Sequence, residues 1–294
     1  MKWRILPLFL GLCLLLTGCA TDSGNPTPES SSVYIQNKGS DTIVNLALAW
    51  AERYQTLRPD VRLSVTGGGS GTGITSLING TVDIANASRA IKPEEIKAAE
   101  ANGIEPVEHV IARDAIAVIV NPQNPVDELT LDQISRIYRG EITNWKELGG
   151  EDRPIVRLSR ETNSGTHVYF LEAVVRLGNS NDKTIFSPLT LLLPSSEGII
   201  SEVASNPNAI GYDGLGYVTD EVKMIAVSRG KDQPYVLPSI QSVNDQSYPI
   251  ARDLYMYSRQ DSSQAVLDYL EWILSAEAQQ IVADLGFVPV QTAQ

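Results

Sequence analysis

The sequence predicts an α/β fold in which strands pair mainly in parallel. Short apolar runs rich in Val and Ile alternate along the chain with longer segments whose apolar residues recur every three or four positions. Strands that alternate with helices typically form a parallel sheet covered by helices. The chain has 294 residues, and the roughly 260 that follow its N-terminal region are enough for two domains or one large α/β unit.

The N-terminal region is predicted to be a signal peptide covering residues 1–18. Lys2 and Arg4 precede an apolar run at 5–16 that is too short to span a membrane as a stable helix. The sequence Leu-Thr-Gly-Cys at 16–19 resembles a bacterial lipobox, which implies that Cys19 becomes the lipid-modified first residue of the mature chain. Residues 19–32 are otherwise rich in Ser, Pro, Thr, Asp and Gly, which predicts a flexible tether.

Composition excludes several classes of site. Cys13 lies in the leader and no Cys follows Cys19, so the folded body has no disulfide, thiolate nucleophile or Cys-based metal site. The two His residues of the body lack His-x-x-x-His spacing, and we expect neither a metal nor a cofactor. The formal charge is −12, and loss of Lys2 and Arg4 with the leader takes it two units further, to −14. An acidic protein of this kind is not expected to bind nucleic acid.

The first expected elements are set by apolar spacing. Strands are expected at 33–35, 61–65 and 82–86. Apolar residues at 43, 46, 47, 50, 51 and 54 have the spacing of a half-buried helix over 42–57, which Pro59 ends. Further helices are expected from residue 74 and over 93–101, the latter with Pro at its first turn.

The remaining elements follow the same logic. Strands are expected at 115–120, 155–158, 209–212 and 250–257. Helices are expected at 130–138, 165–177 and 195–204, and a long amphipathic helix at 263–283.

Three turns share one design, in which a strand is followed by Ser, Thr and Gly residues and then by a helix. They cover residues 38–42 (first turn), 67–73 (second turn) and 160–166 (third turn). Each places hydroxyls and free backbone N–H groups at the positive end of a helix, an arrangement that suits an anion. One such turn is an ordinary helix cap. Three in one chain predict a converging site for an oxyanion.

Each turn supplies candidate binding residues, and each also has a purely structural interpretation as a cap, a tight turn or a surface ion pair. The second turn matches neither the Walker A pattern nor Gly-x-Gly-x-x-Gly, so a nucleotide site is poorly supported. An Arg after a strand can pair bidentately with a tetrahedral oxyanion. The candidates are Ser40, Asp41 and Thr42, then Ser70, then Ser88 and Arg89 after the strand at 82–86, and finally Arg160, Ser164, Gly165 and Thr166.

A catalytic interpretation has weaker support. His167 follows Ser164 by three residues and could act as its base, but neither Ser70 nor Ser164 lies in a Gly-x-Ser-x-Gly motif. We therefore expect no enzyme activity, with an esterase as the alternative.

Taken together and in order, the motifs resemble those of the substrate-binding proteins of high-affinity phosphate ABC transporters. The resemblance extends from Ile35 to Val290. It is carried by Gly-Ser-Asp-Thr at 39–42, the Gly-rich second turn, Asp-Ile-Ala-Asn-Ala-Ser-Arg at 83–89, Ile-Tyr-Arg-Gly at 137–140 with Asn-Trp at 144–145, the third turn with Ser159, and the Gly- and Tyr-rich run at 209–217.

The resemblance implies a two-lobed, periplasmic-binding-protein-like clamshell of type II, each lobe an α/β domain. Lobe 1 would comprise residues 33–112 plus 248–294, and lobe 2 residues 113–247. Inorganic phosphate would lie in the cleft between them, held by the candidate residues named above. The protein would be an extracytoplasmic, lipid-anchored monomer that delivers phosphate to a membrane permease.

One position departs from the family pattern. In some members an Asp at the position of Arg89 accepts the phosphate proton, and the Arg here leaves open which carboxylate selects phosphate over sulfate. Asp41 is the first candidate and Asp83 the second. Alternatives are a binding protein for another tetrahedral oxyanion, such as sulfate, molybdate or arsenate, and a surface sensor or adhesin lipoprotein.

Overall fold

The structure is a computed structural model that describes residues 32–290. The predicted signal peptide, Cys19 and all but the last residue of the predicted tether lie outside the described residues. The described residues form one compact unit. Within the described range, no helix is both long and apolar enough to cross a membrane.

A nine-stranded sheet forms the centre of this unit. Its strand order is β2-β1-β3-β11-β4-β8-β6-β7, with β9 paired to β4, and β5 and β10 form a separate pair. The strands are β1 Val33–Gly39, β2 Val61–Thr66, β3 Ile84–Ala87, β4 Pro106–Val120, β5 Glu128–Thr130, β6 Val156–Arg160, β7 Leu191–Leu193, β8 Ala209–Gly214, β9 Lys223–Met224, β10 Ala226–Ser228 and β11 Ala251–Arg259.

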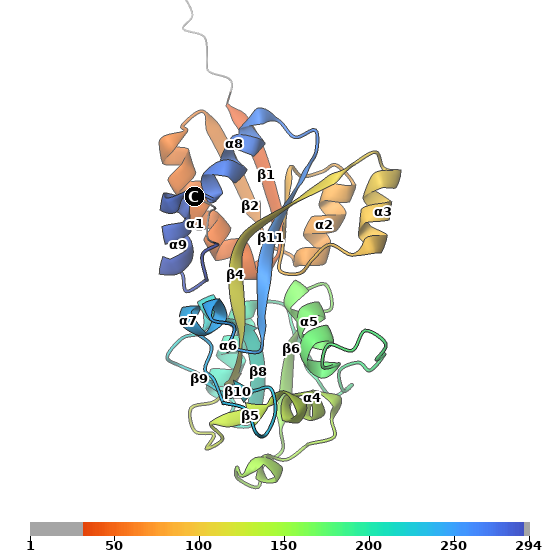
Figure 1. Ribbon diagram of the computed structural model, residues 1–294, viewed down its shortest axis with the longest axis vertical. Helices are drawn as coiled ribbons and strands as arrows, with labels where there is room; N and C mark the ends of the chain where they lie inside the picture. The colour runs from red at the N-terminus through yellow and green to blue at the C-terminus, as the bar shows by residue number, and fades with distance from the viewer. Residues whose placement is uncertain (1–31, 291–294) are drawn as a thin grey trace, which may run out of the picture. The chain divides into compact units, whose positions relative to one another are not determined.

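Strand β4 changes its partner halfway along its length. Its first part, from Pro106 to Ala115, pairs with β11, and its last part, from Ile116 to Val120, pairs with β8. The two long strands β4 and β11 therefore run side by side through the middle of the sheet (Figure 1, yellow and blue).

Strand pairing is mixed rather than mainly parallel. β1 pairs in parallel with β2 and β3, and β6 does so with β7 and β8. Every pair that includes β4 or β11 is antiparallel. The prediction of parallel pairing holds for the outer strands and is wrong for the central ones, because β11 returns along β4 in the opposite direction.

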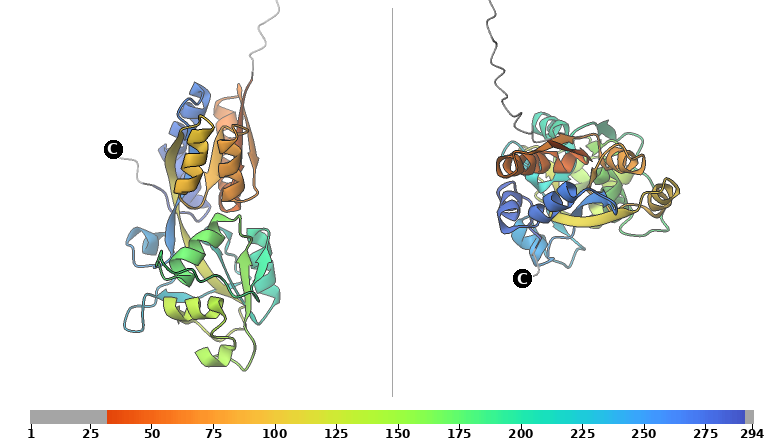
Figure 2. Two further views of the ribbon diagram at one scale, coloured as in Figure 1. Left: turned by 90° about the vertical axis from the view of Figure 1, so that its right-hand side faces the viewer. Right: turned by 90° about the horizontal axis from the view of Figure 1, so that it is seen from above.

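Helices cover both faces of the sheet (Figure 2). The α-helices are α1 Asp41–Leu57, α2 Ser70–Ile78, α3 Pro93–Ala101, α4 Leu131–Arg139, α5 Gly165–Phe170, α6 Ser196–Ser205, α7 Ile240–Asn244, α8 Gln264–Ile273 and α9 Ala276–Asp284. Short helices of other types are η1 Trp145–Leu148, η2 Leu171–Val175 and η3 Leu215–Tyr217.

Buried apolar side chains divide the described chain into two parts. Two clusters contain only residues from 35–112 and 254–287, and in them α1, α8 and α9 pack on one face of the strands while α2 and α3 pack on the other. Two further clusters contain residues from 115–250 together with Val288. We call the first part the first lobe and the second part the second lobe; β4 and β11 connect them.

Several predicted boundaries are corrected by local chemistry. Helix α2 begins at Ser70 rather than Ile74, so the last four residues of the second turn are already helical. The single helix expected at 263–283 is two helices, because the Ser275 hydroxyl accepts the N–H of Ala278 and starts α9 afresh. The helix expected at 165–177 changes at Leu171 into one π-helical turn, η2.

Candidate functional site

The second and third turns are hydrogen-bonded to each other. The backbone N–H of Gly71 donates to the carbonyl of Asn163 at 3.2 Å, and the Asn163 side chain donates to the carbonyl of Gly68 at 3.0 Å. The first and second turns also meet, since the N–H of Gly69 donates to the carbonyl of Gly39 at 3.0 Å. All three turns predicted from the sequence therefore converge at one place.

Three serine hydroxyls form the part of this site that belongs to the first lobe. The Ser40 hydroxyl lies 2.9 Å from that of Ser88, and the Ser70 hydroxyl lies 3.2 Å from the same atom. The backbone N–H of Ser88 donates to the Ser70 hydroxyl at 3.0 Å. Ser40 precedes α1 but makes no side-chain cap bond to it. Its hydroxyl is therefore not used as the ordinary cap that its position suggests.

Two threonine hydroxyls close the site from opposite lobes. Thr42, in the first turn of α1, and Thr166, in the first turn of α5, have hydroxyl oxygens 3.0 Å apart. Ser40, Thr42, Ser70, Ser88 and Thr166 are all at most 1 % exposed. We call these five residues the hydroxyl cluster. A buried group of hydroxyls can both donate and accept, which suits a ligand rich in oxygen atoms.

Gly165 allows the lobes to approach each other at the cluster. A Cβ atom at this position would lie 2.3 Å from the Ser70 hydroxyl and 2.5 Å from that of Ser88. Any side chain here would hold the two lobes apart. Gly73 has a different role, because a Cβ there would lie 2.5 Å from the carbonyl of Lys38 and prevent α2 from packing on β1.

Ser164 and His167, the possible nucleophile and base, face different partners. Ser164 caps α5, because its hydroxyl accepts the N–H of Thr166 at 3.2 Å. The ring of His167 points elsewhere: its Nδ1 lies 3.0 Å from the Ser159 hydroxyl and 2.9 Å from the carbonyl of Arg160. Burial lowers the pKa of His167. The proposed Ser164–His167 pair thus lacks the hydrogen bond that a nucleophile and its base require.

Arg160 joins the two lobes through Asp41. Its Nη2 lies 2.7 Å from an oxygen of Asp41 and 2.9 Å from the carbonyl of Pro194, and its Nη1 donates to the Ser196 hydroxyl at 2.8 Å. The other Asp41 oxygen accepts the N–H of Gly68 at 2.8 Å. Arg160 and Asp41 therefore lie beside the hydroxyl cluster and already bind each other.

Arg89 lies at the edge of the site. Its two terminal nitrogens contact the two carboxylate oxygens of Glu95 at 2.8 and 2.7 Å. Asp83, the second candidate carboxylate, accepts the backbone N–H of Gln36 at 2.8 Å. Both residues thus have partners outside the hydroxyl cluster.

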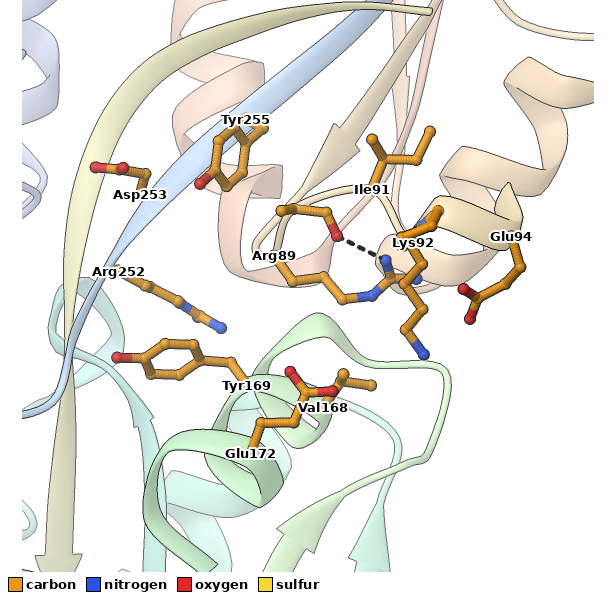
Figure 3. A pocket seen from close by; sticks show the side chains of 12 residues that line it. Arg89, Ile91, Lys92, Glu94, Val168, Tyr169, Glu172, Arg252, Asp253 and Tyr255 are labelled. Atoms are coloured by element: carbon orange, nitrogen blue, oxygen red, sulfur yellow. Dashed lines mark hydrogen bonds between the residues drawn. The ribbon is translucent and has the colours of Figure 1, made fainter. Parts of the chain in front are cut away.

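A cavity of about 590 Å³ has Arg89 and Arg252 among the residues that line it. Figure 3 shows Arg252 pointing into it from β11, with Arg89 and Lys92 on one side and Tyr169 and Glu172 on the other. Arg252 therefore borders this cavity and also contacts the hydroxyl cluster.

Sequence reasoning missed Arg252, which has the most contacts with the cluster. Its Nη2 lies 3.0 Å from the Thr166 hydroxyl and 3.3 Å from that of Thr42, and its Nη1 donates to the carbonyl of Ser88 at 3.0 Å. It also forms an ion pair with Asp114 at 3.0 Å and lies 5.5 Å from the centre of the Tyr169 ring.

Sequence reasoning also missed Asp114, and a signal for Arg252 and Asp114 exists in the strand pattern. Residues 250, 252, 254 and 256 form the inward-facing set of their strand, and only position 252 in that set is charged. Asp114 is the one charged residue in the run 114–120 of β4, which is buried at every position and otherwise apolar. Because alternate residues of a strand face one side, a charge in such a set must find a buried partner.

Two buried carboxyl groups lie behind the cluster. Burial raises the pKa of Asp114 to about 6, although Arg252 opposes the shift. Burial also raises the pKa of Asp213, and the nearby charge of Arg160 opposes this shift most strongly.

Among the described residues, no group of three or more His, Cys, Asp or Glu side chains is arranged to hold a metal ion.

Comparisons with known proteins identify the family of this chain. Residues 25–277 match the PBP superfamily domain. The chain is 30 % identical to the phosphate-binding protein PstS of Pseudomonas aeruginosa, covering 87 % of this chain and 83 % of the relative. It is 31 % identical to PstS of Bacillus subtilis, covering 89 % and 82 %.

The fold is similarly matched by solved structures. A putative phosphate ABC transporter substrate-binding protein with bound phosphate from Clostridium perfringens has a TM-score of 0.79 and 35 % identity, covering 88 % of this chain and all of that one. An ABC-type phosphate transport receptor from Vibrio cholerae has a TM-score of 0.70 and 27 % identity, covering 87 % and 100 %. The chain, with its two connected α/β lobes and converging turns, belongs to the phosphate-binding protein family of phosphate ABC transporters, within the PBP superfamily.

Proposed function

We propose that this protein binds inorganic phosphate at the hydroxyl cluster and delivers it to the permease of a phosphate ABC transporter. The observation that carries this proposal is the meeting of hydroxyls from both lobes around Arg252 and Gly165. Hydroxyls and a guanidinium group in a buried site make strong, directional hydrogen bonds to a tetrahedral oxyanion. The relatives named as phosphate-binding proteins support the same ligand.

Binding and closure are coupled in this proposal. Thr42, Ser40, Ser70 and Ser88 belong to the first lobe, and Thr166 and Gly165 to the second. A phosphate ion contacts both sets only when the lobes are together, so it binds the closed form more tightly and shifts the population toward it. The permease then recognises the closed form. This chain supplies binding and no covalent chemistry.

Isothermal titration calorimetry with phosphate and with sulfate tests the ligand. We expect tight 1:1 binding of phosphate and much weaker binding of sulfate. Heat from sulfate, molybdate or arsenate with none from phosphate would assign the site to another oxyanion. A protein that binds none of these anions would contradict the proposal and favour a sensor or adhesin.

We further propose that the protein is an extracytoplasmic monomer held to the membrane through a lipid on Cys19. The support is the apolar leader and the Leu-Thr-Gly-Cys sequence at 16–19. Replacing Cys19 with Ala should release the protein from the membrane fraction, and mass spectrometry of the mature N-terminus should lose the lipid mass. Size-exclusion chromatography with light scattering tests the monomer.

A further inference from the structure

Arg157 differs from the other buried arginines of the protein. Within residues 32–290, four arginines are at most 9 % exposed. Three of them, Arg89, Arg160 and Arg252, each contact a carboxylate oxygen, at 2.7, 2.7 and 3.0 Å respectively. The fourth, Arg157, is 5 % exposed, and its side chain forms neither an ion pair nor a hydrogen bond with any described residue. It is therefore the only buried arginine of this range without a counter-charge.

The side chain of Arg157 points into the apolar core of the second lobe. Arg157 lies on β6 and pairs with Ile210 of β8. Residues that are paired in neighbouring strands face the same side of a sheet, and Ile210 packs in one cluster with Tyr138 and Phe170. The Nε and Nη1 atoms of Arg157 are enclosed by protein and have no hydrogen-bond partner in the described part of the chain. The Nη2 atom is not enclosed in this way, so one end of the guanidinium group reaches solvent.

This guanidinium group cannot become neutral by losing its proton. Burial lowers the pKa of Arg157 and Tyr138 opposes the shift, but an arginine side chain keeps its proton in proteins. Tyr138 supplies no counter-charge, because burial raises its pKa well above the usual value and the phenol stays neutral. An isolated buried charge is strongly unfavourable. An anion beside Arg157 would remove this penalty.

A second buried polar group lies at the same level of the sheet. Leu158 of β6 pairs with Leu191 of β7, and Arg157 and Thr190 directly precede these two residues. The hydroxyl oxygen of Thr190 is enclosed by protein and, among residues 32–290, has no hydrogen-bond partner. A guanidinium group and a hydroxyl can both donate hydrogen bonds to an anion.

The turn at 187–190 gives this place a connection to the surface. The N–H of Ser187 donates to the carbonyl of Tyr138 at 2.8 Å, and the N–H of Thr190 donates to the carbonyl of Ser187 at 2.9 Å. These bonds attach the turn to α4, yet Leu189 within it is 74 % exposed. Arg157 thus lies beside a surface turn, and an ion can approach it from the side of Nη2.

We propose that Arg157 and Thr190 form a second anion site, which binds a small monovalent anion such as formate or chloride. One edge of the guanidinium group, made by Nε and Nη2, can donate two parallel hydrogen bonds to a carboxylate. A single guanidinium group is neutralised by one negative charge. Hydrogen phosphate with two charges would leave a buried excess charge, so this site does not compete for phosphate.

The second anion site is separate from the hydroxyl cluster and independent of the function proposed above. Arg157 and Arg160 are three positions apart on β6, so their side chains leave opposite faces of the strand. Arg160 faces Asp41 in the first lobe, whereas Arg157 faces the core of the second lobe. The anion stabilises the folded chain because the unfolded chain has no such site.

Urea denaturation of the mature protein in saturating phosphate tests the proposal. Sodium formate, or in a second series sodium chloride, is increased at constant ionic strength, which the bulky sulfonate HEPES maintains. Once most sites are filled, we expect the equilibrium constant for unfolding to fall about tenfold for each tenfold rise in anion concentration. Arg157→Leu should abolish this response, and Thr190→Val should weaken anion binding about fivefold through the loss of one hydrogen bond.

Arg153→Leu is the matched control. The side chain of Arg153 lies just before β6, is 46 % exposed and contacts Glu151 at 2.7 Å. This variant should keep the anion response of the wild type within about twofold. A wild type that responds to neither anion, or an equal response in Arg157→Leu, would refute the second anion site.

Should Arg157→Leu fail to fold, crystals of the wild type soaked in sodium bromide give an independent answer. Bromide replaces chloride and is located by its anomalous scattering. We expect a bromide peak within hydrogen-bond distance of both the Arg157 guanidinium group and the Thr190 hydroxyl. Bromide peaks at other places only would overturn the inference. Absence of phosphate binding would refute the proposed function and leave the second anion site unaffected.

Discussion

The hydroxyl oxygens of Thr42 and Thr166, separated by 124 positions in the sequence, lie 3.0 Å apart in the folded protein. Each is in the first turn of a helix, and the two helices belong to different lobes. Arg252 contacts both hydroxyls from the strand that joins the lobes. These three side chains define where a ligand would have to lie to contact both lobes at once.

Arg252→Gln should weaken phosphate binding by at least about 30-fold, because truncating one partner of a buried, hydrogen-bonded charge pair costs about 2–5 kcal/mol. The variant also leaves Asp114 without its cation. The matched control is Arg113→Gln, next to Asp114 on β4, whose side chain is 47 % exposed and pairs with Asp253 at 3.3 Å. Calorimetry should find the control within about twofold of the wild type. Equal losses in both variants would show that Arg252 does not face the ligand.

Gly165→Ala should abolish closure while leaving each lobe folded. The new methyl group would lie 2.3 Å from the Ser70 hydroxyl, so the lobes must move apart or the serines must turn away. Either change removes hydrogen bonds to the ligand, and we expect phosphate affinity to fall by at least about 100-fold, equivalent to about 2.7 kcal/mol. Gly230→Ala is the control, since a Cβ there has no atom within 4 Å. Normal affinity of Gly165→Ala would mean that the lobes do not meet at this residue when phosphate is bound.

Asn163→Ala should speed the release of phosphate. It removes the side-chain bond to Gly68 across the lobes but keeps the backbone bond to Gly71. A typical hydrogen bond contributes about 1 kcal/mol net, so the dissociation rate should rise about fivefold with little change in the association rate. Stopped-flow measurement of both rates checks this, with Asn181→Ala in an exposed part of the second lobe as the control. A slower association rate with unchanged dissociation would place Asn163 on the entry path instead.

The stability of the protein should depend on pH through His167 and Asp114 with opposite signs. Burial lowers the pKa of His167, so the folded state binds a proton less readily than the unfolded chain, and stability is lost as the pH falls below about 6.5. The pKa of Asp114 is raised to about 6 from 3.8. Its contribution is fully present below pH 3.8 and is lost as the pH rises through about 6.

Urea denaturation between pH 7.5 and 5 measures both effects. His167→Gln should reduce the acid-induced loss of stability, and Asp114→Asn should increase it, each by at most about 1.4 kcal/mol per pH unit. Parallel pH profiles for the wild type and both variants would contradict both assignments.

The order of strands and helices followed from local patterns, and the three turns were found because each carries its own motif. Where the prediction was wrong, contacts distant in the sequence decided the outcome. Nothing in the sequence of either strand alone indicates that β11 pairs with β4 in an antiparallel direction. Arg160 and Asp41 were both assigned to the ligand, but nothing in their local sequences indicates that they lie 2.7 Å from each other. Arg252 lacks a surrounding motif, and only its place in an inward-facing set could have revealed it.

Strand β11 comes late in the chain, so the site that we propose for phosphate is complete only after this strand has folded into the sheet. This strand fills the space between β3 and β4 and brings Arg252 to a site whose other parts are made much earlier. A chain that ended before residue 251 would lack both a central strand and the cation, so no fragment from the N-terminal side should retain phosphate. Phosphate binding can therefore serve as an assay for completed folding. A single measurement reports that β11, from the last third of the polypeptide, has packed against β3, from the first third.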